Sequence, residues 1–263
     1  MLEAKNISFR IGAKTLISEA SISFAPGKLH LMIGPNGAGK STLIKLLAGS
    51  LRSQIGKVEY DGFDIRNSRG SELAKRRAVL SQAVEIAFPL TVREVVMMGR
   101  YPHFGGRPGA TDASIVDEMM DFFDVTEFAD RNYQTLSGGE RQRVNFARVL
   151  AQLWRHDTAS LSNSCRYLFL DEPLTFLDIH HQIEFMNKIR DFTDTSDVVT
   201  VGVVHDLNLA ARFADQIVLL SQGRIVASGT ATEVLTADRI REVFQVETTF
   251  IPVEKTGVHL VFD

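Results

Sequence analysis

The chain has 263 residues, with 29 Lys and Arg against 32 Asp and Glu, a formal charge of -3 and 44% hydrophobic residues. This composition fits a protein with a large buried core and does not fit disordered, collagen-like or coiled-coil chains. The near-neutral charge lacks the basic excess of nucleic-acid binders, so we expect no nucleic-acid partner. No run approaches the roughly 18 apolar residues that cross a bilayer, and we expect a cytosolic chain. The single cysteine, Cys165, cannot form a disulfide within the chain, which suits a reducing compartment.

The first part of the chain predicts short strands followed by one helix. Apolar residues alternate with polar ones up to residue 33, and Gly or Pro bounds each piece. The period then changes, because GPNGAGKS (34–41) leads into an apolar pattern of helical spacing that ends at Gly49. The alternating residues, each set expected on one face of its strand, are Ile7, Phe9 and Ile11, then Ile22 and Phe24, then Leu29, Leu31 and Ile33; the helical ones are Leu43, Leu46 and Leu47.

Four further apolar runs predict buried strands, and helical patterns separate them. Strands that alternate with helices favour a mainly parallel sheet covered on both faces, so the expected fold class is α/β. Between about residues 89 and 153 several helical patterns follow one another, which predicts a helical insertion into the sheet domain. The polar run 156–164 predicts a surface loop. The predicted strands are 77–81, 167–170, 198–204 and 216–220.

Residues 34–41 match the phosphate-binding loop pattern in the strand–loop–helix context that the pattern requires. Glycines let backbone N–H groups wrap a phosphate, and the helix N-terminus adds its positive dipole end. We expect Lys40 to contact the β- and γ-phosphates of a nucleotide and the Ser41 hydroxyl to bind Mg²⁺. A glycine-rich turn that carries a lysine by chance is the alternative. The expected nucleotide-binding residues are Asn36, Gly37, Ala38, Gly39, Lys40, Ser41 and Thr42.

A second candidate site is the run YLFLDE (167–172), which is apolar and ends abruptly in two acids. A buried parallel strand would deliver both carboxylates at its C-terminal end, beside the nucleotide. Asp171 would then hold the Mg²⁺ shell, and Glu172 would orient or deprotonate the attacking water. Taken alone, such a strand end is more often the start of an exposed loop, and it is the phosphate loop upstream that favours the metal site.

The run LSGGE (136–140) places a serine and two glycines at the start of a predicted helix. This pattern forms a second anion-binding helix N-terminus, and one nucleotide cannot easily use both. Here the residues resemble the ATP-binding cassette family, whose ATPases pair head to tail so that this signature closes on the partner's ATP. By that resemblance, Ser137, Gly138 and Gly139 bind the ATP held by a second copy of the chain.

The resemblance covers nearly the whole chain in the expected order: the phosphate loop, Gln82, the signature, LFLDE, LTFLD (174–178) and His205. It implies that Gln82 senses Mg²⁺ and the attacking water while linking to the membrane subunit. It also implies that Asp178 lies at the dimer seam and that His205 contacts the γ-phosphate. The implied cofactors are ATP and Mg²⁺, the implied catalytic residues are Glu172, His205 and Gln82, and the implied metal-site residues are Ser41, Gln82 and Asp171.

The fold that this family implies is a P-loop NTPase of the RecA-like type, with a mainly parallel sheet core, an antiparallel β subdomain and an inserted α-helical subdomain. We expect one ATPase domain over residues 1–263. Its core would span 1–88 and 155–240, and its helical subdomain, which carries the signature, would span 89–154. A C-terminal extension would span 241–263.

Two positions depart from the family pattern. The family usually has an aromatic residue that stacks on adenine near the position of Ile11, and Phe9 or a looser apolar contact would serve here instead. In LTFLD, Phe176 replaces the commoner small residue and leaves Asp178 in place. The first departure affects the contact with adenine, and the second affects the packing of the dimer seam.

The run GRYPH (99–103) looks like the branch of the family that powers import of iron chelates, haem and cobalamin. Within that branch, the helix that runs from the signature to Trp154 and the polar insertion after it resemble haemin-importer ATPases most closely. A ferric siderophore or cobalamin importer is the alternative. A helix stopped by Gly and Pro also accounts for 99–103 in structural terms. We expect no haem site on this chain, because in such systems the cargo passes through the membrane subunits.

The resemblance implies three kinds of partner: a second copy of the chain, the transmembrane permease subunits, and, indirectly, a periplasmic substrate-binding protein. The chain would lie peripherally on the cytoplasmic face of the bacterial inner membrane. A soluble cassette ATPase that acts on DNA or ribosomes is a different class, and it generally needs coiled-coil arms or tandem cassettes that this chain has no room for. A lone phosphate-loop kinase or GTPase is a third class, and the signature argues against it.

Overall fold

The computed structural model describes residues 1–81, 86–155, 165–175, 177–195, 197–253 and 257–262. The chain begins with an antiparallel sheet in the order β2-β1-β4-β5. In its first hairpin Asn6 and Glu19 have positive φ values of 50° and 52°, and the pairing register shifts beside both. The strands are β1 (Leu2–Ile11), β2 (Lys14–Phe24), β4 (Ile55–Tyr60) and β5 (Phe63–Asp64).

A six-stranded sheet forms the centre of the molecule, in the order β10-β9-β3-β8-β7-β6. The edge strand β10 pairs antiparallel with β9, and the other pairs are parallel. All the residues of β8 are buried, as expected for a central strand that is covered on both faces. The strands are β3 (Lys28–Ile33), β6 (Arg77–Leu80), β7 (Arg166–Leu170), β8 (Val198–Val203), β9 (Gln216–Ser221) and β10 (Arg224–Gly229).

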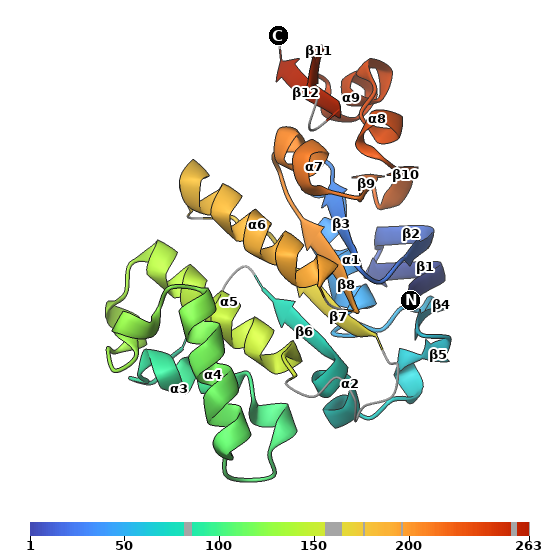
Figure 1. The fold of residues 1–263 in the computed structure, drawn as a ribbon. Helices are drawn as coiled ribbons and strands as arrows, with labels where there is room; N and C mark the ends of the chain where they lie inside the picture. Colours follow the sequence, from blue (N-terminus) through green and yellow to red (C-terminus); the bar gives the residue numbers. More distant parts are fainter. Residues whose placement is uncertain (82–85, 156–164, 176, 196, 254–256, 263) are drawn as a thin grey trace.

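The helices fall into three groups along the chain. The first group (α1, η1 and α2) precedes β6, a second group lies between β6 and β7, and the rest follow β7. Figure 1 shows the middle group beside the sheet, away from both termini. The α-helices are α1 (Lys40–Leu47), α2 (Gly70–Arg76), α3 (Val92–Met98), α4 (Ala110–Phe122), α5 (Gly138–Leu153), α6 (Ile179–Asp194), α7 (Leu207–Phe213), α8 (Ala231–Val234) and α9 (Ala237–Phe244). The 3₁₀ helices are η1 (Ile65–Asn67), η2 (Tyr101–His103), η3 (Thr126–Phe128) and η4 (Tyr133–Thr135).

Alternate residues of the central strands enter two different apolar cores. Leu168 and Leu170 of β7 join the core that contains α5, α6 and α7. Tyr167 and Phe169 of the same strand join the core that contains α1 and the inner face of the antiparallel sheet. Side chains alternate between the faces of a strand, so the six-stranded sheet is the middle layer between these two covers.

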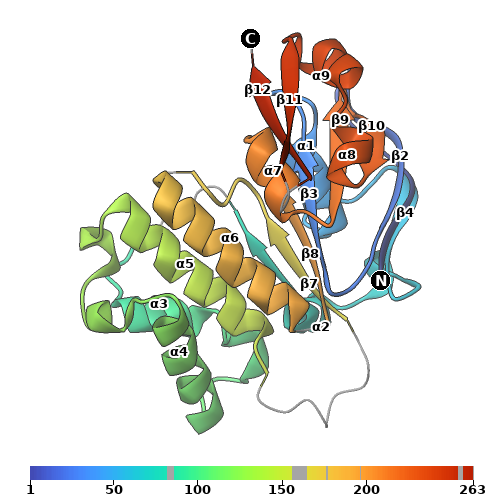
Figure 2. The ribbon, with the colours of Figure 1, turned by 45° about the horizontal axis from the view of Figure 1, so that its top comes forward.

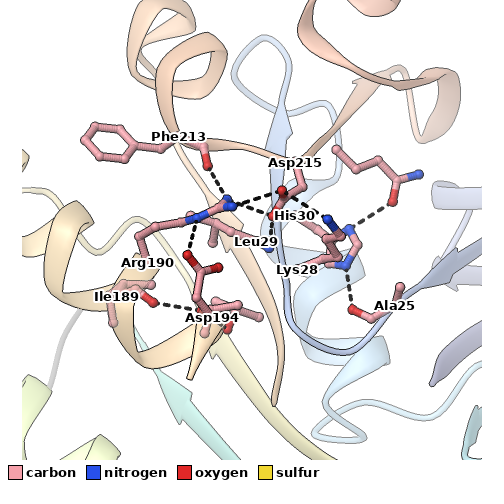
Figure 3. Close-up of polar contacts among 12 residues, drawn as sticks. Ala25, Lys28, Leu29, His30, Ile189, Arg190, Asp194, Phe213 and Asp215 are labelled. Atoms are coloured by element: carbon pink, nitrogen blue, oxygen red, sulfur yellow. Dashed lines mark hydrogen bonds and ion pairs between the residues drawn. The ribbon is translucent and has the colours of Figure 1, made fainter. Parts of the chain in front are cut away.

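A network of polar side chains ties α6 to the amino-terminal ends of β3 and β9. The guanidinium of Arg190 donates to both carboxylate oxygens of Asp215, at 2.8 and 3.1 Å. Oδ2 of Asp215 also accepts the backbone N–H of Leu29 at 2.8 Å. Figure 3 shows Arg190 and Asp215 facing each other between the helix and the sheet, with the buried His30 nearby. The network therefore fixes α6 against the sheet at the edge where the parallel strands begin.

The described chain ends in a hairpin of β11 (Thr248–Val253) and β12 (Gly257–Phe262). The side-chain amide of Asn208 in α7 donates to the backbone oxygen of Leu260 at 3.0 Å and accepts its N–H at 2.7 Å. Figure 2 shows the hairpin beside α7, α8 and α9. Over the residues that the structure describes, no helix has the length and apolar character needed to span a bilayer.

The four later strands lie where the sequence predicts them, with ends within one residue of the prediction. The helical patterns of 89–153 form α3, α4 and α5. In β3, Met32 lies between the predicted core residues Leu31 and Ile33 and points to the other face of the strand. It is also buried, because the parallel sheet is covered on both faces. The polar run 156–164 lies outside the described residues.

Of the three residues expected on one face of β1, Ile7 and Phe9 pack against the same core. Ile7 is fully buried, whereas Ile11 is 63% exposed. The register shifts on either side of Phe9 place the extra residue in β2, so they leave the alternation along β1 unchanged, and Ile11 is exposed at the end of the strand. A sequence pattern with period two does not show where along a strand the covering core stops.

Candidate functional site

The loop between β3 and α1 has a backbone that only glycine fits at two positions. Gly34 and Gly39 have φ values of 147° and 103°. A Cβ atom on Gly34 would lie 2.2 Å from the carbonyl oxygen of Leu220, and one on Gly39 would lie 2.7 Å from that of Leu16. The loop is therefore pressed against β9 and β2, and it ends at the N-terminus of α1, whose first N–H groups have no partner within the helix. A loop of this shape can wrap an anion.

Lys40 begins α1 and turns its side chain back over this loop. Its Nζ atom donates to the carbonyl oxygens of Gly34 at 2.7 Å and Pro35 at 3.0 Å. The residue is 5% exposed, and this burial lowers the pKa of Lys40, although the carboxylates of Glu172 and Asp171 oppose the shift. The ammonium is thus held inside the loop, where it can bind an oxygen atom of an anion.

Ser41 and Asp171 meet although they lie far apart in the sequence. The Ser41 hydroxyl donates to Oδ1 of Asp171 at 2.8 Å. Burial raises the pKa of Asp171, while the Ser41 bond and the ammonium groups of Lys45 and Lys40 oppose the shift. A hydroxyl and a carboxylate oxygen at this distance form a pair of oxygen donors. Such a pair fits Mg²⁺, which binds oxygen ligands and keeps places for phosphate and water.

Glu172 and His205 form the next pair along the same edge of the sheet. Oε1 of Glu172 lies 2.9 Å from Nε2 of His205, and the two side chains are 19% and 49% exposed. Glu172 follows Asp171 directly after β7 and has a φ of 53°, which a residue other than glycine rarely adopts. Both residues border a cavity of about 260 Å³, which has room for water or for part of a ligand. A carboxylate held in this way can take a proton from a water molecule in the cavity.

These groups converge because the parallel strands end at one edge. The phosphate loop follows β3, the two acids follow β7, and His205 follows β8, which lies between those two strands. The carboxyl ends of parallel strands meet at the same edge of a sheet, and this edge is where α/β proteins bind ligands. The arrangement can hold a phosphate chain, a divalent cation and a water molecule close together.

The glycine-rich run at 137–139 starts α5. Ser137 is exposed, and it caps the helix by accepting the N–H of Glu140 at 3.3 Å while Oε2 of Glu140 accepts the N–H of Ser137 at 2.7 Å. Gly138 is exposed as well, so the first turn of the helix is open to solvent. The side chain of Gln142 donates to the carbonyl oxygen of Pro173 at 2.6 Å. The first turns of α5 are therefore bonded to the segment that follows Glu172.

Asp178 caps α6 at the surface. Its Oδ1 accepts the N–H of His181 at 2.9 Å and lies 2.8 Å from Nδ1 of the same residue. These bonds from His181 hold the pKa of Asp178 below its usual value. The Asp178 side chain is 65% exposed, so most of the carboxylate faces solvent.

The sequence from residue 17 to residue 175 matches the family model described as ABC transporter. The chain belongs to the ABC transporter family. It therefore has the ATP-binding cassette fold, a P-loop NTPase, and it is an ATPase that is coupled to transport.

Curated relatives of this cassette match it over nearly their whole length. The protein named Hemin import ATP-binding protein HmuV from Mesorhizobium japonicum is 42% identical over 247 residues, which cover 93% of this chain and 91% of that protein. The protein of the same name from Gloeobacter violaceus is 42% identical over 261 residues, which cover 99% of this chain and 93% of that protein.

Solved cassette structures share the fold. An inward-facing conformation of a putative metal-chelate type ABC transporter aligns with a TM-score of 0.81 at 23% identity, over 100% of this chain and 96% of that one. The ADP conformation of the ATP-binding cassette MJ1267 aligns with a TM-score of 0.78 at 23% identity, over 93% of this chain and 98% of that one. A dimeric structure of the cassette MJ0796 aligns with a TM-score of 0.74 at 24% identity, over 88% and 99%.

The structure of the cassette brings some of the predicted site residues together and leaves others apart. Lys40, Ser41, Asp171, Glu172 and His205 gather at the carboxyl edge of the sheet. The run 137–139 and the cap of α6 lie on other helices at the surface. Two residues singled out in the sequence, Gln82 and Phe176, lie outside the described residues.

At the position where the family pattern has an aromatic residue, this cassette presents Ile11 at the exposed end of β1. Phe9 is partly buried and packs against the core beneath the antiparallel sheet. Of the two apolar contacts considered for adenine, only Ile11 therefore offers most of its side chain to solvent. A flat apolar surface can lie on such a side chain without ring stacking.

Sequence reasoning missed the bond between Gln142 and Pro173. Gln142 lies in the first turns of α5, where a polar residue usually faces solvent, and Pro173 follows the acids at the end of β7. Nothing in the local pattern of either segment predicts the bond, because it depends on how the helix packs against the sheet.

Proposed function

We propose that this chain is the ATP-hydrolysing subunit of a bacterial importer that takes up haem. The observation that carries the proposal is the similarity to hemin import ATP-binding proteins at 42% identity over 93% to 99% of the chain, far beyond the nucleotide-binding motifs. A ferric siderophore or cobalamin importer is the second candidate, and the fold of the metal-chelate type transporter is compatible with it. A soluble cassette ATPase without a membrane partner is the candidate from a different class.

For ATP binding, we assign the backbone of 36–42 and the Lys40 ammonium to the phosphate chain. Ser41 and Asp171 would hold Mg²⁺, because their oxygens already lie 2.8 Å apart. Gln82 would join them. When bound, Mg²⁺ supplies positive charge that offsets the charge on the β- and γ-phosphates.

For hydrolysis, we assign Glu172 as the group that orients the attacking water and accepts its proton. The oxygen of that water forms a bond to the γ-phosphorus, and the bond from this phosphorus to the bridging oxygen breaks. His205 would donate a hydrogen bond to the γ-phosphate and, through its contact with Glu172, help to orient the carboxylate. Glu172 would thus act on the attacking water, and His205 would act on the phosphate that the water attacks.

We propose that two copies pair head to tail around two ATP molecules. Ser137, Gly138 and Gly139 would bind the ATP of the partner copy, since the first turn of α5 is open to solvent. Asp178, which is also exposed, would lie at the seam. The existence of a dimeric cassette structure with the same fold supports this arrangement.

The helical group α3 to α5 would form a subdomain over 89–154 within a domain that spans 1–263, with core segments 1–88 and 155–240 and a C-terminal extension over 241–263. We propose that this subdomain receives the transmembrane permease, and that the permease receives cargo from a periplasmic substrate-binding protein. The chain would then sit on the cytoplasmic face of the inner membrane as a peripheral subunit.

Transport by the reconstituted complex tests the cargo assignment. The chain would be assembled with its permease in liposomes, and ATP-dependent uptake of haem, a ferric siderophore and cobalamin would be compared, with Lys40→Ala as the inactive control. We expect haem uptake to exceed the other two by about tenfold, a difference of about 1.4 kcal/mol in discrimination. Uptake of another cargo instead of haem would overturn the haem assignment alone. Failure to associate with any permease would favour a soluble ATPase.

A further inference from the structure

A cavity of about 170 Å³ lies where the C-terminal end of α1 meets β4, η1 and α2. Apolar side chains line part of it, and the remainder carries two hydroxyl side chains and three guanidinium groups. No acidic side chain lines this cavity within the described part of the chain. Because α1 begins at the phosphate loop and ends here, about 12 Å of helix separates the cavity from the nucleotide site. The polar side chains are Ser53, Ser68, Arg52, Arg66 and Arg77.

Arg77 brings an unpaired donor to this cavity. Its Nη1 atom is buried and has no hydrogen-bond partner among the residues that the structure describes. Gly49, with a φ of 68°, makes room for the guanidinium, because a Cβ atom there would lie 2.9 Å from Nη1. A buried donor without a partner costs about 1–3 kcal/mol, and more when it is charged. An acceptor supplied by a ligand would remove this cost.

Three carbonyl oxygens in the last turn of α1 already accept hydrogen bonds. At the end of α1, the carbonyl oxygen of Leu46 accepts the N–H of Gly49 at 3.0 Å. The oxygen of Leu47 accepts the Tyr60 hydroxyl at 2.8 Å, and that of Lys45 accepts the N–H of Ser50 at 2.9 Å. These carbonyl groups have less capacity left for a guanidinium.

The charges of the three arginines are not equally balanced. Arg66 forms an ion pair with Asp64 at 2.6 Å. Arg52 and Arg77 form no ion pair with any acidic group of the described residues. Over the described part of the chain, two positive charges therefore have no acidic partner beside a small cavity, and both guanidinium groups present the planar donors that bind phosphate in pairs.

We propose that this cavity binds the phosphate group of a small phosphate monoester at a site separate from the ATP site. Arg77 contacts the phosphate from inside, Arg52 contacts it from the rim, and Ser53 and Ser68 supply further donors. The organic part of the ligand lies on the apolar side chains, among them Leu51. A whole nucleotide does not fit, since drug-sized ligands occupy cavities of about 300–1,000 Å³.

Calorimetric titration tests the proposal on the full chain with a non-hydrolysable ATP analogue and Mg²⁺ at saturation, so that the nucleotide site, including its γ-phosphate position, is filled. The probes are inorganic phosphate and n-butyl phosphate. We expect both to bind, and butyl phosphate to bind at least about fourfold more tightly, which corresponds to the burial of one CH₂ group. Loss of all phosphate binding when the ATP analogue is present would place the binding in the nucleotide site and overturn the proposal.

Variants locate the binding. Arg77→Met and Arg52→Gln are each expected to weaken phosphate binding about tenfold or more, with affinity for the ATP analogue unchanged. Arg69→Gln is the matched control, because Arg69 is exposed, lies close in sequence and does not line the cavity. Arg52 is itself exposed, so its variant keeps the test valid if Arg77→Met fails to fold. Equal weakening in all three variants would show a general charge effect and contradict the proposed site.

Discussion

Nε2 of His205 lies 2.9 Å from Oε1 of Glu172, and the two residues stand at the ends of adjacent parallel strands. The backbone of Glu172 is held at a φ of 53°, a conformation that costs about 1–3 kcal/mol. Two bonds support it: the N–H of Asp171 donates to the oxygen of Leu80 at 2.8 Å, and the hydroxyl of Thr175 donates to the oxygen of Glu172 at 3.1 Å. The carboxylate is thus positioned by its surroundings before any ligand binds.

Replacing Glu172 by Gln should leave ATP binding intact and reduce turnover by at least about 100-fold, because the amide cannot accept the proton of the attacking water. ATP would then accumulate in the closed pair, which size-exclusion chromatography would detect as a dimer. Glu242→Gln, on the exposed face of α9, is the matched control and should hydrolyse ATP normally. Turnover of Glu172→Gln at the wild-type rate would show that the water-activating role is wrong.

Replacing His205 by Ala should lower the rate of ATP hydrolysis about 100-fold, since one hydrogen-bond donor to the developing charge is lost. Nucleotide affinity should change little, because the phosphate loop remains. His205→Gln keeps a donor and is expected to retain more activity than the Ala variant. Rate and affinity are read from steady-state hydrolysis and nucleotide titration. Equal, wild-type rates in both variants would remove His205 from the site.

Replacing Ser137 by Arg should block hydrolysis in the site of the partner copy while Lys40-dependent ATP binding persists. The large charged side chain would fill the open first turn of α5. Ser137→Ala is the matched control, since it also loses the helix cap, which stabilises by about 0.5–2 kcal/mol, but leaves the turn accessible. We therefore expect the Ala variant to keep much of its activity. Cooperative hydrolysis by Ser137→Arg would contradict the head-to-tail pairing.

Replacing Arg100 by Leu should destabilise the chain by about 3–5 kcal/mol, because it leaves the buried carboxylate of Asp112 unpaired. The guanidinium also donates to the last turn of α5, at the oxygens of Ala151 (2.7 Å) and Trp154 (3.1 Å). The free energy of unfolding in urea measures the loss. Arg93→Leu breaks an exposed ion pair and should cost about 1 kcal/mol or less. Similar losses in both variants would contradict this account.

Stability should fall as the pH drops below about 6.5 because of two histidines. Burial lowers the pKa of His30, although its contacts with the oxygen of Ala25 (3.0 Å) and the side chain of Gln216 (2.8 Å) oppose the shift (Figure 3). Burial likewise lowers the pKa of His103. Below the ordinary histidine pKa, the unfolded chain binds protons that the folded chain does not, so the free energy of unfolding decreases.

The size of this effect is at most about 1.4 kcal/mol per pH unit for His30, and less for the more solvated His103. Urea unfolding between about pH 8 and about pH 5.5 measures the slope. His30→Gln should flatten it, whereas His180→Gln, which changes an exposed histidine, should not. An unchanged slope in His30→Gln would mean that another group titrates over this range.

Much of the molecule follows from the sequence alone. Three features depend on residues within a few positions of one another. They are the positions of the later strands and helices along the chain, the glycine positions of the phosphate loop, and the cap at Ser137. Their physical causes are local: backbone sterics, the period of apolar residues and the hydrogen bonds of a helix end. Among the expected strand faces, the local pattern did not show that Ile11, at the end of β1, is exposed.

The tertiary structure decided which distant groups meet. The bond from Ser41 to Asp171, the pairing of Glu172 with His205 and the contact of Gln142 with Pro173 each join segments that sequence spacing does not relate. Such contacts depend on strand order, on the register of each strand and on how helices pack over the sheet. These are set by burial of apolar surface across the whole chain, a global property that no single motif contains.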